Sequence, residues 1–483
     1  MRRLIVFIFF LCALPLASLQ SLGQARRIAQ PTPATAGAAA AASPDTRAAS
    51  ALYDEAANYA QKKYEEFASK QLPFDPALLE KTAQEQKELA ARYAATLIAR
   101  PNLSGEELYY TGLLYNLSAN EERTVEVLKR FLDSAPQAVG EHAQYARYIM
   151  AHRTAQMNRL EEAESTLAAY LRSEPRKPSE RVTMENALTS AYRKNKQLER
   201  ALPHAEEAFK AAKSLQTSAK NPSADRLLNI SSTALVDIYQ AMKKPAGEMT
   251  AVLEEVRKLA IAAPSPRLYV DTTEKLADVL VDSKRKPEAL KLIEDAILYT
   301  KASIAADSQR YVLQSLLRKQ KQLRLQGELA PEIIVSKWIG QTPVQISALR
   351  GHVLLLDFWA TWCGPCLRAF PHLREWHEKY KDKGLVILGL TKYYGQGNGQ
   401  EMTPEEELVF IEHFKKQYNL PYGMAVTETD NNHRNYGVTA IPTAVLIDRQ
   451  GVIRLVTTGT GGGNETEIAA TIEKLLEEKP ERQ

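Results

Sequence analysis

Cys363 and Cys366, separated by two residues, are the side chains in this chain best suited to chemistry. Thiols at this spacing can close into a disulfide with little backbone movement. An apolar run at 353–359 precedes the pair, and a helical pattern at 368–380 follows it. The first thiol therefore lies where a helix dipole favours its anionic form, which is the form that attacks disulfides. The pattern predicts redox chemistry on dithiols and disulfides.

A metal site is the other chemistry that two such cysteines could support. Structural zinc takes four ligands, and the chain has no second cysteine pair to complete the set. His372 and His377 follow on the same predicted helix, and neither has a spacing typical of a four-ligand site. We therefore expect no metal and no cofactor.

The N-terminus has the pattern of a secretory signal peptide. Two arginines precede an apolar stretch at 4–19, and small residues near position 25 suit a signal peptidase. We expect residues 1–25 to be a signal peptide and the protein to be exported to the periplasm or another extracytoplasmic space. The alternative is retention of the segment as a membrane anchor, because its apolar run is only slightly short for a span. Removal of the segment, which contains Cys12, would leave no cysteine outside the reactive pair.

Composition and periodicity divide the rest of the chain into three parts. Residues 26–46 lack periodicity and large apolar groups, which predicts a disordered linker. Residues 47–327 show helical periodicity and residues 328–480 alternate strand and helix patterns. The fold class expected is a multidomain chain, with an all-α region followed by an α/β domain. The 62 basic and 58 acidic residues nearly balance, so we expect no nucleic-acid partner.

Small residues recur in the helical region where paired helices would have to approach closely. Gly112 occupies such a position in one unit, Ala163 in the next, and Ala205 and Ala289 in later ones. The pattern resembles the tetratricopeptide repeat, although the spacing is looser and the stretch 223–264 fits poorly. The resemblance implies a concave face that binds a protein partner. The alternative is an irregular helical bundle.

Three separated motifs near the C-terminus resemble those of the exported thioredoxin-like thiol-disulfide reductases of the TlpA/ResA type. They are the stretches Phe358–Cys366, Gly437–Thr443 and Leu446–Gly451, and they occur in the order of that family. The resemblance implies a thioredoxin fold over 328–480. It also implies that Cys363 is the exposed attacking sulfur and Cys366 the buried resolving one.

Asp357 interrupts the otherwise apolar strand that leads to the cysteines. Burial of a carboxylate there should raise its pKa toward neutrality. Resemblance to thioredoxin implies that Asp357 takes a proton from Cys366 during turnover. The alternative is a hydrogen-bonded structural acid at the end of a strand. No lysine follows on the neighbouring strand until Lys392, so a lysine-assisted relay is less expected.

The resemblance further implies a peptide-binding groove beside the disulfide. Pro442 is expected to be cis, so that the backbone of Ile441 can pair with an extended substrate. Trp362, Gly364 and Pro365 would complete the groove; Gly364 leaves Cys363 unobstructed, and Pro365 suits the first turn of a helix. The Gly-Pro pair is the one found in thioredoxin, which implies a reductant.

Two residues argue against particular functions found among proteins of this fold. Ala369 stands where the exported cytochrome-maturation reductases commonly carry a glutamate, which weakens a role in cytochrome c maturation. Ala360 stands where peroxidases of this fold carry a threonine, so peroxide reduction is not expected. A glycine-rich stretch at 392–400, followed by a capping box from Thr403, is expected to form a mobile loop beside the site, with its two tyrosines near substrate.

The sequence therefore predicts an extracytoplasmic thiol-disulfide oxidoreductase that reduces protein disulfides. Its partners would be a protein disulfide substrate, an upstream thiol electron donor and a protein held by the helical repeats. It would meet the membrane only if the signal segment is retained. The alternative is a repeat-based scaffold whose thioredoxin domain binds peptide without turnover.

Overall fold

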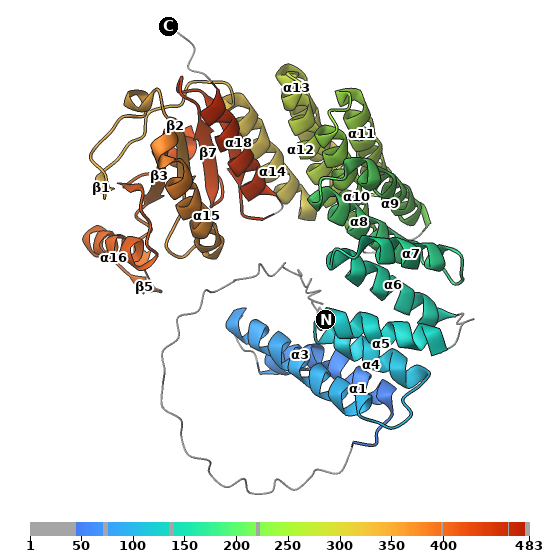
Figure 1. Cartoon of the computed structure of the whole chain (residues 1–483). Helices are drawn as coiled ribbons and strands as arrows, with labels where there is room; N and C mark the ends of the chain where they lie inside the picture. The colour runs from blue at the N-terminus through green and yellow to red at the C-terminus, as the bar shows by residue number, and fades with distance from the viewer. Residues whose placement is uncertain are drawn as a thin grey trace, which may run out of the picture. The chain divides into compact units, whose positions relative to one another are not determined.

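The computed structural model describes residues 45–70, 76–134, 140–218, 223–397, 399–461 and 463–478. The signal peptide expected at 1–25 and residues 26–44 of the expected linker lie outside these ranges. Within them, the chain is helical from Ala49 to Leu325 and alternates strands and helices from Lys337 onward, as expected for the fold class (Figure 1).

The first part of the chain consists of successive helices. They are α1 (Ala49–Ala57), α2 (Tyr59–Ser69), α3 (Pro76–Ile98), α4 (Glu106–Leu117), α5 (Glu121–Ser134), α6 (Glu141–Gln156), α7 (Leu160–Leu171), α8 (Pro178–Lys194), α9 (Leu198–Ser218), α10 (Ala224–Ala241), α11 (Ala246–Ala262), α12 (Pro266–Asp282), α13 (Lys286–Ser303) and α14 (Ala306–Leu325). Among the helices of the described residues, none has the length and apolarity of a membrane span.

Five helix pairs, from α4/α5 to α12/α13, share one type of turn. After the first helix of each pair, one residue adopts a left-handed conformation with φ between 55° and 61°. The next backbone N–H bonds back to the carbonyl five residues earlier, as in Asn120 to Tyr115 and Arg285 to Leu280. This is the Schellman arrangement, which satisfies carbonyls at a helix end. The left-handed residues are Ala119, Asn158, Lys196, Lys243 and Lys284.

The stretch 223–264 was expected to fit the tetratricopeptide pattern poorly, and it nonetheless contains a helix pair. It forms the pair α10/α11 with the same turn at Lys243. The pair buries leucines such as Leu228, Leu235 and Leu253 together with small residues such as Ser231 and Ala260. The feature that all five units share is the turn. These turns are farther apart than the about 34 residues of a tetratricopeptide repeat.

The second part of the chain is built on a six-stranded sheet with the order β1-β6-β3-β2-β7-β8. Strands β2, β3 and β6 are parallel, and β1, β7 and β8 run antiparallel to their neighbours. The strands are β1 (Lys337–Ile339), β2 (Val353–Phe358), β3 (Leu385–Lys392), β6 (Gly423–Thr427), β7 (Thr443–Ile447) and β8 (Ile453–Thr458), and a small separate pair comprises β4 (Gln396–Gly397) and β5 (Gln400–Glu401). The helices are α15 (Gly364–Tyr380), α16 (Pro404–Gln417), α17 (Asn431–Asn435) and α18 (Asn464–Glu477), with short 3₁₀ turns at Ile346–Leu349 and Lys381–Lys383.

Every residue of β2 is buried, because apolar clusters cover both faces of the sheet. Val353 and Leu355 pack with α15, α16 and α18 on one face. Leu354 and Leu356 pack with Tyr436 and its neighbours after α17 on the other. Side chains alternate along a strand, so Asp357 lies on the α15 face. A strand buried on both faces holds its C-terminal end rigidly, and that end leads directly to Cys363.

Helix α14 continues into the sheet domain without a long linker. Gly327 adopts φ +88°, as expected for a helix C-cap, and its N–H bonds to the Ile453 carbonyl at 2.8 Å. The Gln326 side chain donates to the Arg454 carbonyl at 2.9 Å, and the Gln322 side chain donates to Thr458 at 3.2 Å. These contacts tie the end of α14 to β8.

Gly112 in α4 shows why a small residue is needed between paired helices. A Cβ added there would lie 2.4 Å from Leu128 Cδ2 in α5, far inside contact distance. We therefore predict that Gly112→Ala lowers the free energy of unfolding by about 1–3 kcal/mol, the usual cost of overpacking. Urea unfolding followed by circular dichroism measures the change.

Gly247→Ala is the matched control, because Gly247 lies in helix α11 and a Cβ there would meet nothing within 4 Å. The better helix propensity of alanine should make this variant more stable by about 0.5–1 kcal/mol. Equal and small effects for both substitutions would show that α4 and α5 do not pack as described.

Candidate active site

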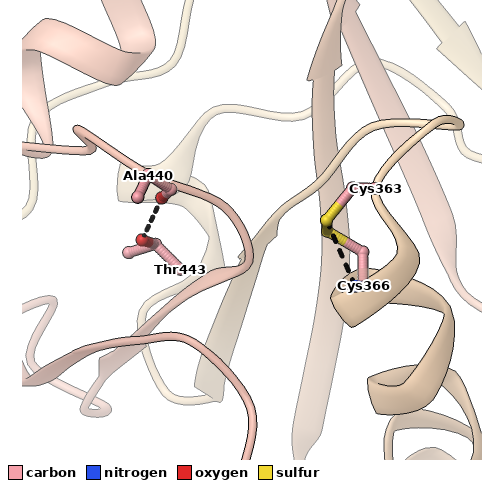
Figure 2. Close-up of a disulfide and its surroundings, with 4 residues drawn as sticks. All are labelled: Cys363, Cys366, Ala440 and Thr443. Carbon is pink, nitrogen blue, oxygen red and sulfur yellow. Dashed lines mark hydrogen bonds between the residues drawn. A yellow bond between two sulfur atoms is a disulfide. The ribbon is translucent and has the colours of Figure 1, made fainter. Parts of the chain in front are cut away.

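The two cysteines lie at the junction of β2 and α15, as the sequence predicted, and they form a disulfide (Figure 2). Cys363 is the N-cap of α15, and its Sγ accepts the backbone N–H of Cys366 at 3.2 Å. Pro365 occupies the first turn, where its missing N–H costs nothing. A Cβ on Gly364 would meet no atom within 4 Å, so the approach over Gly364 is open. The first turn of α15 is thus built to stabilise charge on the Cys363 sulfur.

The exposure of the cysteines differs from the expectation. Cys363 is only 3% exposed and Cys366 1%, so the prediction of an exposed Cys363 is wrong for this disulfide-bonded form. Both cysteines belong to an apolar cluster that includes Trp359 and Phe370. Trp362, by contrast, is 53% exposed.

The loop before β7 lies beside the disulfide (Figure 2). The Ile441–Pro442 peptide is cis, which confirms the prediction for Pro442. Thr443 pairs with Phe358, at the end of the strand that leads to the cysteines. Its hydroxyl donates to the Ala440 carbonyl at 2.7 Å and fixes the loop conformation. The structure therefore places Ile441 and Pro442 next to the cysteine-bearing turn.

Asp357 is 3% exposed, and burial raises its pKa from 3.8 to about 7, as predicted. None of the described residues donates a hydrogen bond to its carboxyl group, unlike the alternative of a hydrogen-bonded structural acid. Asp357 instead borders a cavity of about 30 Å³ that also touches Pro442, His372 and Glu465. A cavity of this size has room for one water molecule.

Among the described residues, burial is the one influence that shifts the pKa of Asp357, and no lysine contributes. The Lys392 ammonium lies 2.6 Å from the Asp430 carboxylate and 4.9 Å from the centroid of the Tyr394 ring. Lys392 is therefore engaged at the outer end of β3. Burial is therefore the cause of the raised pKa of Asp357.

Sequence reasoning missed Glu407, which organises the segment between β3 and α16. Its carboxylate is 1% exposed and accepts the backbone N–H groups of Tyr394 and Gly395. The Tyr394 ring lies perpendicular to Trp362, with 5.1 Å between the ring centroids. Of the two tyrosines expected near substrate, Tyr394 is the one that contacts the active-site tryptophan. The sequence signal that could have identified Glu407 was an acidic residue on the side of helix α16 that faces the interior.

Within the described residues, no group of histidine, cysteine and acidic side chains is arranged to hold a metal ion. The polar chemistry of the site comes from the disulfide, Asp357 and the end of helix α15.

Comparison with known proteins agrees with this arrangement. The sequence profile of the AhpC/TSA family matches residues 326–456. The chain is 29% identical over 140 residues to the thiol-disulfide oxidoreductase ResA of Bacillus thuringiensis subsp. konkukian, an alignment that covers 29% of this chain and 73% of that protein. The C-terminal domain of this chain is thus similar to the thioredoxin-like thiol-disulfide oxidoreductases.

Two further similarities concern the same thioredoxin-like domain. Protein DipZ of Mycobacterium bovis is 32% identical over 139 residues, which cover 28% of this chain and 19% of DipZ. A crystal structure of a thiol:disulfide interchange protein of the thioredoxin family from Chlorobium tepidum is 21% identical, with a TM-score of 0.26, and the match covers 31% of this chain and 97% of that chain. The thioredoxin-like fold itself follows from the strand order described above.

The raised pKa of Asp357 predicts how the stability of the thioredoxin-like domain depends on pH. Between about pH 4 and pH 7 the folded state holds a proton that the unfolded chain has released. The stability linked to this proton is fully present below about pH 4 and is lost as the pH rises through about 7. Asp357→Asn should therefore raise the free energy of unfolding at pH 8.5, by on the order of 3–4 kcal/mol, and much less at pH 5.

Urea unfolding of the oxidised protein at the two pH values measures this difference. Asp382→Asn is the control, because Asp382 is an exposed carboxylate in the same domain. A gain in stability that is the same at both pH values would contradict a carboxyl group titrating near neutrality.

Proposed function

We propose that this protein reduces protein disulfides by dithiol exchange through Cys363 and Cys366. The observation that carries the proposal is the position of the Cys363 sulfur, at the N-terminus of α15 and beside the Pro442 loop. A helix N-terminus stabilises the thiolate that attacks a substrate. The adjacent loop offers a backbone edge to an extended peptide. Neither cysteine is committed to a structural role elsewhere in the described chain.

The first step joins enzyme and substrate covalently. In the reduced enzyme, the Cys363 thiolate attacks one sulfur of the substrate disulfide. A bond forms between Cys363 Sγ and that sulfur, and the substrate S–S bond breaks. The second substrate sulfur leaves as a thiolate, which takes a proton from solvent.

The second step releases the substrate. Asp357, whose pKa is raised to about 7, accepts the proton of the Cys366 thiol. The Cys366 thiolate then attacks Cys363 Sγ, which closes the enzyme disulfide and expels the other substrate sulfur as a thiolate. Two electrons have passed to the substrate, and the enzyme is left in the disulfide form of this structure. A dithiol donor must reduce it again before the next turnover.

We further propose that the protein is exported and that its helical repeats hold a protein partner. The N-terminal sequence pattern supports export. The five helix pairs support the second proposal, because stacked pairs provide an extended surface for protein binding. The partner, the electron donor and the substrate would all be proteins or thiols, with no role for nucleic acid.

Other functions receive less support from the site. Ala360 is fully buried and has no hydroxyl that could bind a peroxide, so this position does not support peroxide reduction. Ala369 lines the small cavity, where a glutamate would have suited a cytochrome-maturation reductase. A scaffold that binds peptide without turnover would not need a disulfide at a helix N-terminus.

Cys366→Ser should trap the covalent intermediate, because the resolving thiol is missing. Incubated in reduced form with oxidised insulin, this variant should accumulate a mixed disulfide that disappears on adding dithiothreitol. Non-reducing gel electrophoresis followed by mass spectrometry identifies the adduct on Cys363. Cys363→Ser should give no adduct and should lose insulin reduction entirely.

The variant with both cysteines replaced by serine separates the enzyme from the scaffold. It should form no adduct and reduce no insulin while its repeats keep their fold. A double variant that captures insulin as well as Cys366→Ser would favour the scaffold.

Asp357 acts as a base in the second step, so this step should become faster as the pH rises through about 7. Asp357→Asn should lose that pH dependence and slow release of the mixed disulfide at pH 8 by about a hundredfold. Stopped-flow measurement of release from preformed mixed disulfide tests both points. A wild-type release rate that is flat between pH 6 and pH 8 would exclude Asp357 as the base.

A further inference from the structure

The first turns of α16 carry three consecutive glutamates with different surroundings. Glu405 and Glu406 are exposed, whereas Glu407 is 1% exposed. A buried carboxylate is costly unless hydrogen bonds replace its water. Glu407 receives them from the backbone N–H of Tyr394, at 2.9 and 3.0 Å, and from that of Gly395, at 2.8 Å.

Capping of α16 does not explain this burial. Thr403 accepts the N–H of Glu406, and the Glu406 carboxylate accepts the N–H of Thr403, which completes a capping box. The helix end is thus satisfied without Glu407. The partners of Glu407 lie instead in the segment that follows β3, so its carboxylate fixes that segment on the helix.

The segment held by Glu407 presents Tyr394 to the active site. The Tyr394 ring meets Trp362 edge to face, at 89° and with 5.1 Å between centroids. On another side, the Lys392 ammonium lies 4.9 Å from the Tyr394 centroid and is itself paired with Asp430 at 2.6 Å. The position of Tyr394 is therefore fixed by its backbone bond to Glu407 and by the contacts of its ring with Trp362 and Lys392.

Trp362 directly precedes Cys363, and more than half of its surface is exposed. Because Trp362 is the chain neighbour of Cys363 and is exposed, a residue beside the reacting cysteine of a substrate can contact its ring. An aromatic ring added to the Trp362–Tyr394 pair can pack edge to face or offset, which favours it over a small side chain.

We propose that Glu407 positions Tyr394 against Trp362, so that the two rings form an aromatic wall that selects protein disulfides with an aromatic residue next to the reacting cysteine. This proposal rests on the proposed reductase function and adds a substrate class to it. Glu407 acts here as a positioning residue, and Tyr394 and Trp362 are the residues that contact substrate.

The test compares two synthetic peptides, each closed by one disulfide, that differ only in phenylalanine or alanine next to one cysteine. Reduction is driven by dithiothreitol, and kcat/KM is measured for each peptide. Oxidised glutathione, which has no aromatic group, reports the intrinsic exchange rate. The wild-type protein should prefer the phenylalanine peptide by about two- to tenfold, as expected for one aromatic contact.

Glu407→Gln should bring this preference close to one, mainly through KM, because the amide replaces an accepting oxygen by a donor facing the backbone N–H groups. Glu405→Gln is the matched control. It makes the same chemical change two residues earlier, on the exposed side of α16. It should keep the wild-type preference.

Tyr394→Ala and Tyr394→Phe keep the proposal testable if Glu407→Gln fails to fold. The phenylalanine variant retains the ring and should retain the preference, whereas the alanine variant should lose it. Adding Trp362→Ala to Tyr394→Ala should cause little further loss, because the two rings act as one unit.

The outcomes separate the two proposals. A wild-type protein that reduces neither peptide nor oxidised glutathione overturns the reductase function and this inference with it. A protein that reduces both peptides at equal rates, or a folded Glu407→Gln variant that keeps the preference, overturns the inference alone.

Discussion

Burial of β2 on both faces is the constraint on which the active site depends. The strand is clamped between two apolar clusters, so its C-terminal end has little freedom. Two consequences follow for the chemistry. Cys363 is held at the N-terminus of α15 with its sulfur bonded to the Cys366 N–H, and Asp357 is kept away from water, which brings its pKa to about 7. The same packing thus fixes the position of the Cys363 sulfur and keeps the Asp357 carboxyl group buried.

Much of the site could be predicted because it depends on local sequence. The cysteine pair, the capping box at Thr403 and the cis proline at Pro442 each belong to short motifs, and the burial of Asp357 follows from its apolar strand. Glu407 could not be predicted in this way, because its partners are backbone N–H groups of a separate segment. The burial of Cys363 was also missed, because it depends on the disulfide and the surrounding rings.

In the helical region, too, some features could be predicted from the sequence and others could not. The close helix contact at Gly112 could be predicted, because Gly112 is a small residue within a helical pattern. The pair α10/α11 was not recognised in this way, although it too buries small residues such as Ser231 and Ala260. Its turn at Lys243 matches the other four, although the five turn residues are alanine, asparagine and lysine. A backbone conformation can repeat where the side chains do not, and a search for repeated letters then overlooks it.

Those turns have a consequence for engineering. Lysine in a left-handed conformation carries a backbone penalty of about 1–2 kcal/mol, and it occurs at Lys196, Lys243 and Lys284. Asparagine, already present at Asn158, tolerates this conformation better. All three lysines precede the domain that bears the disulfide. Each of the three positions can therefore be replaced separately to raise the stability of the helical region.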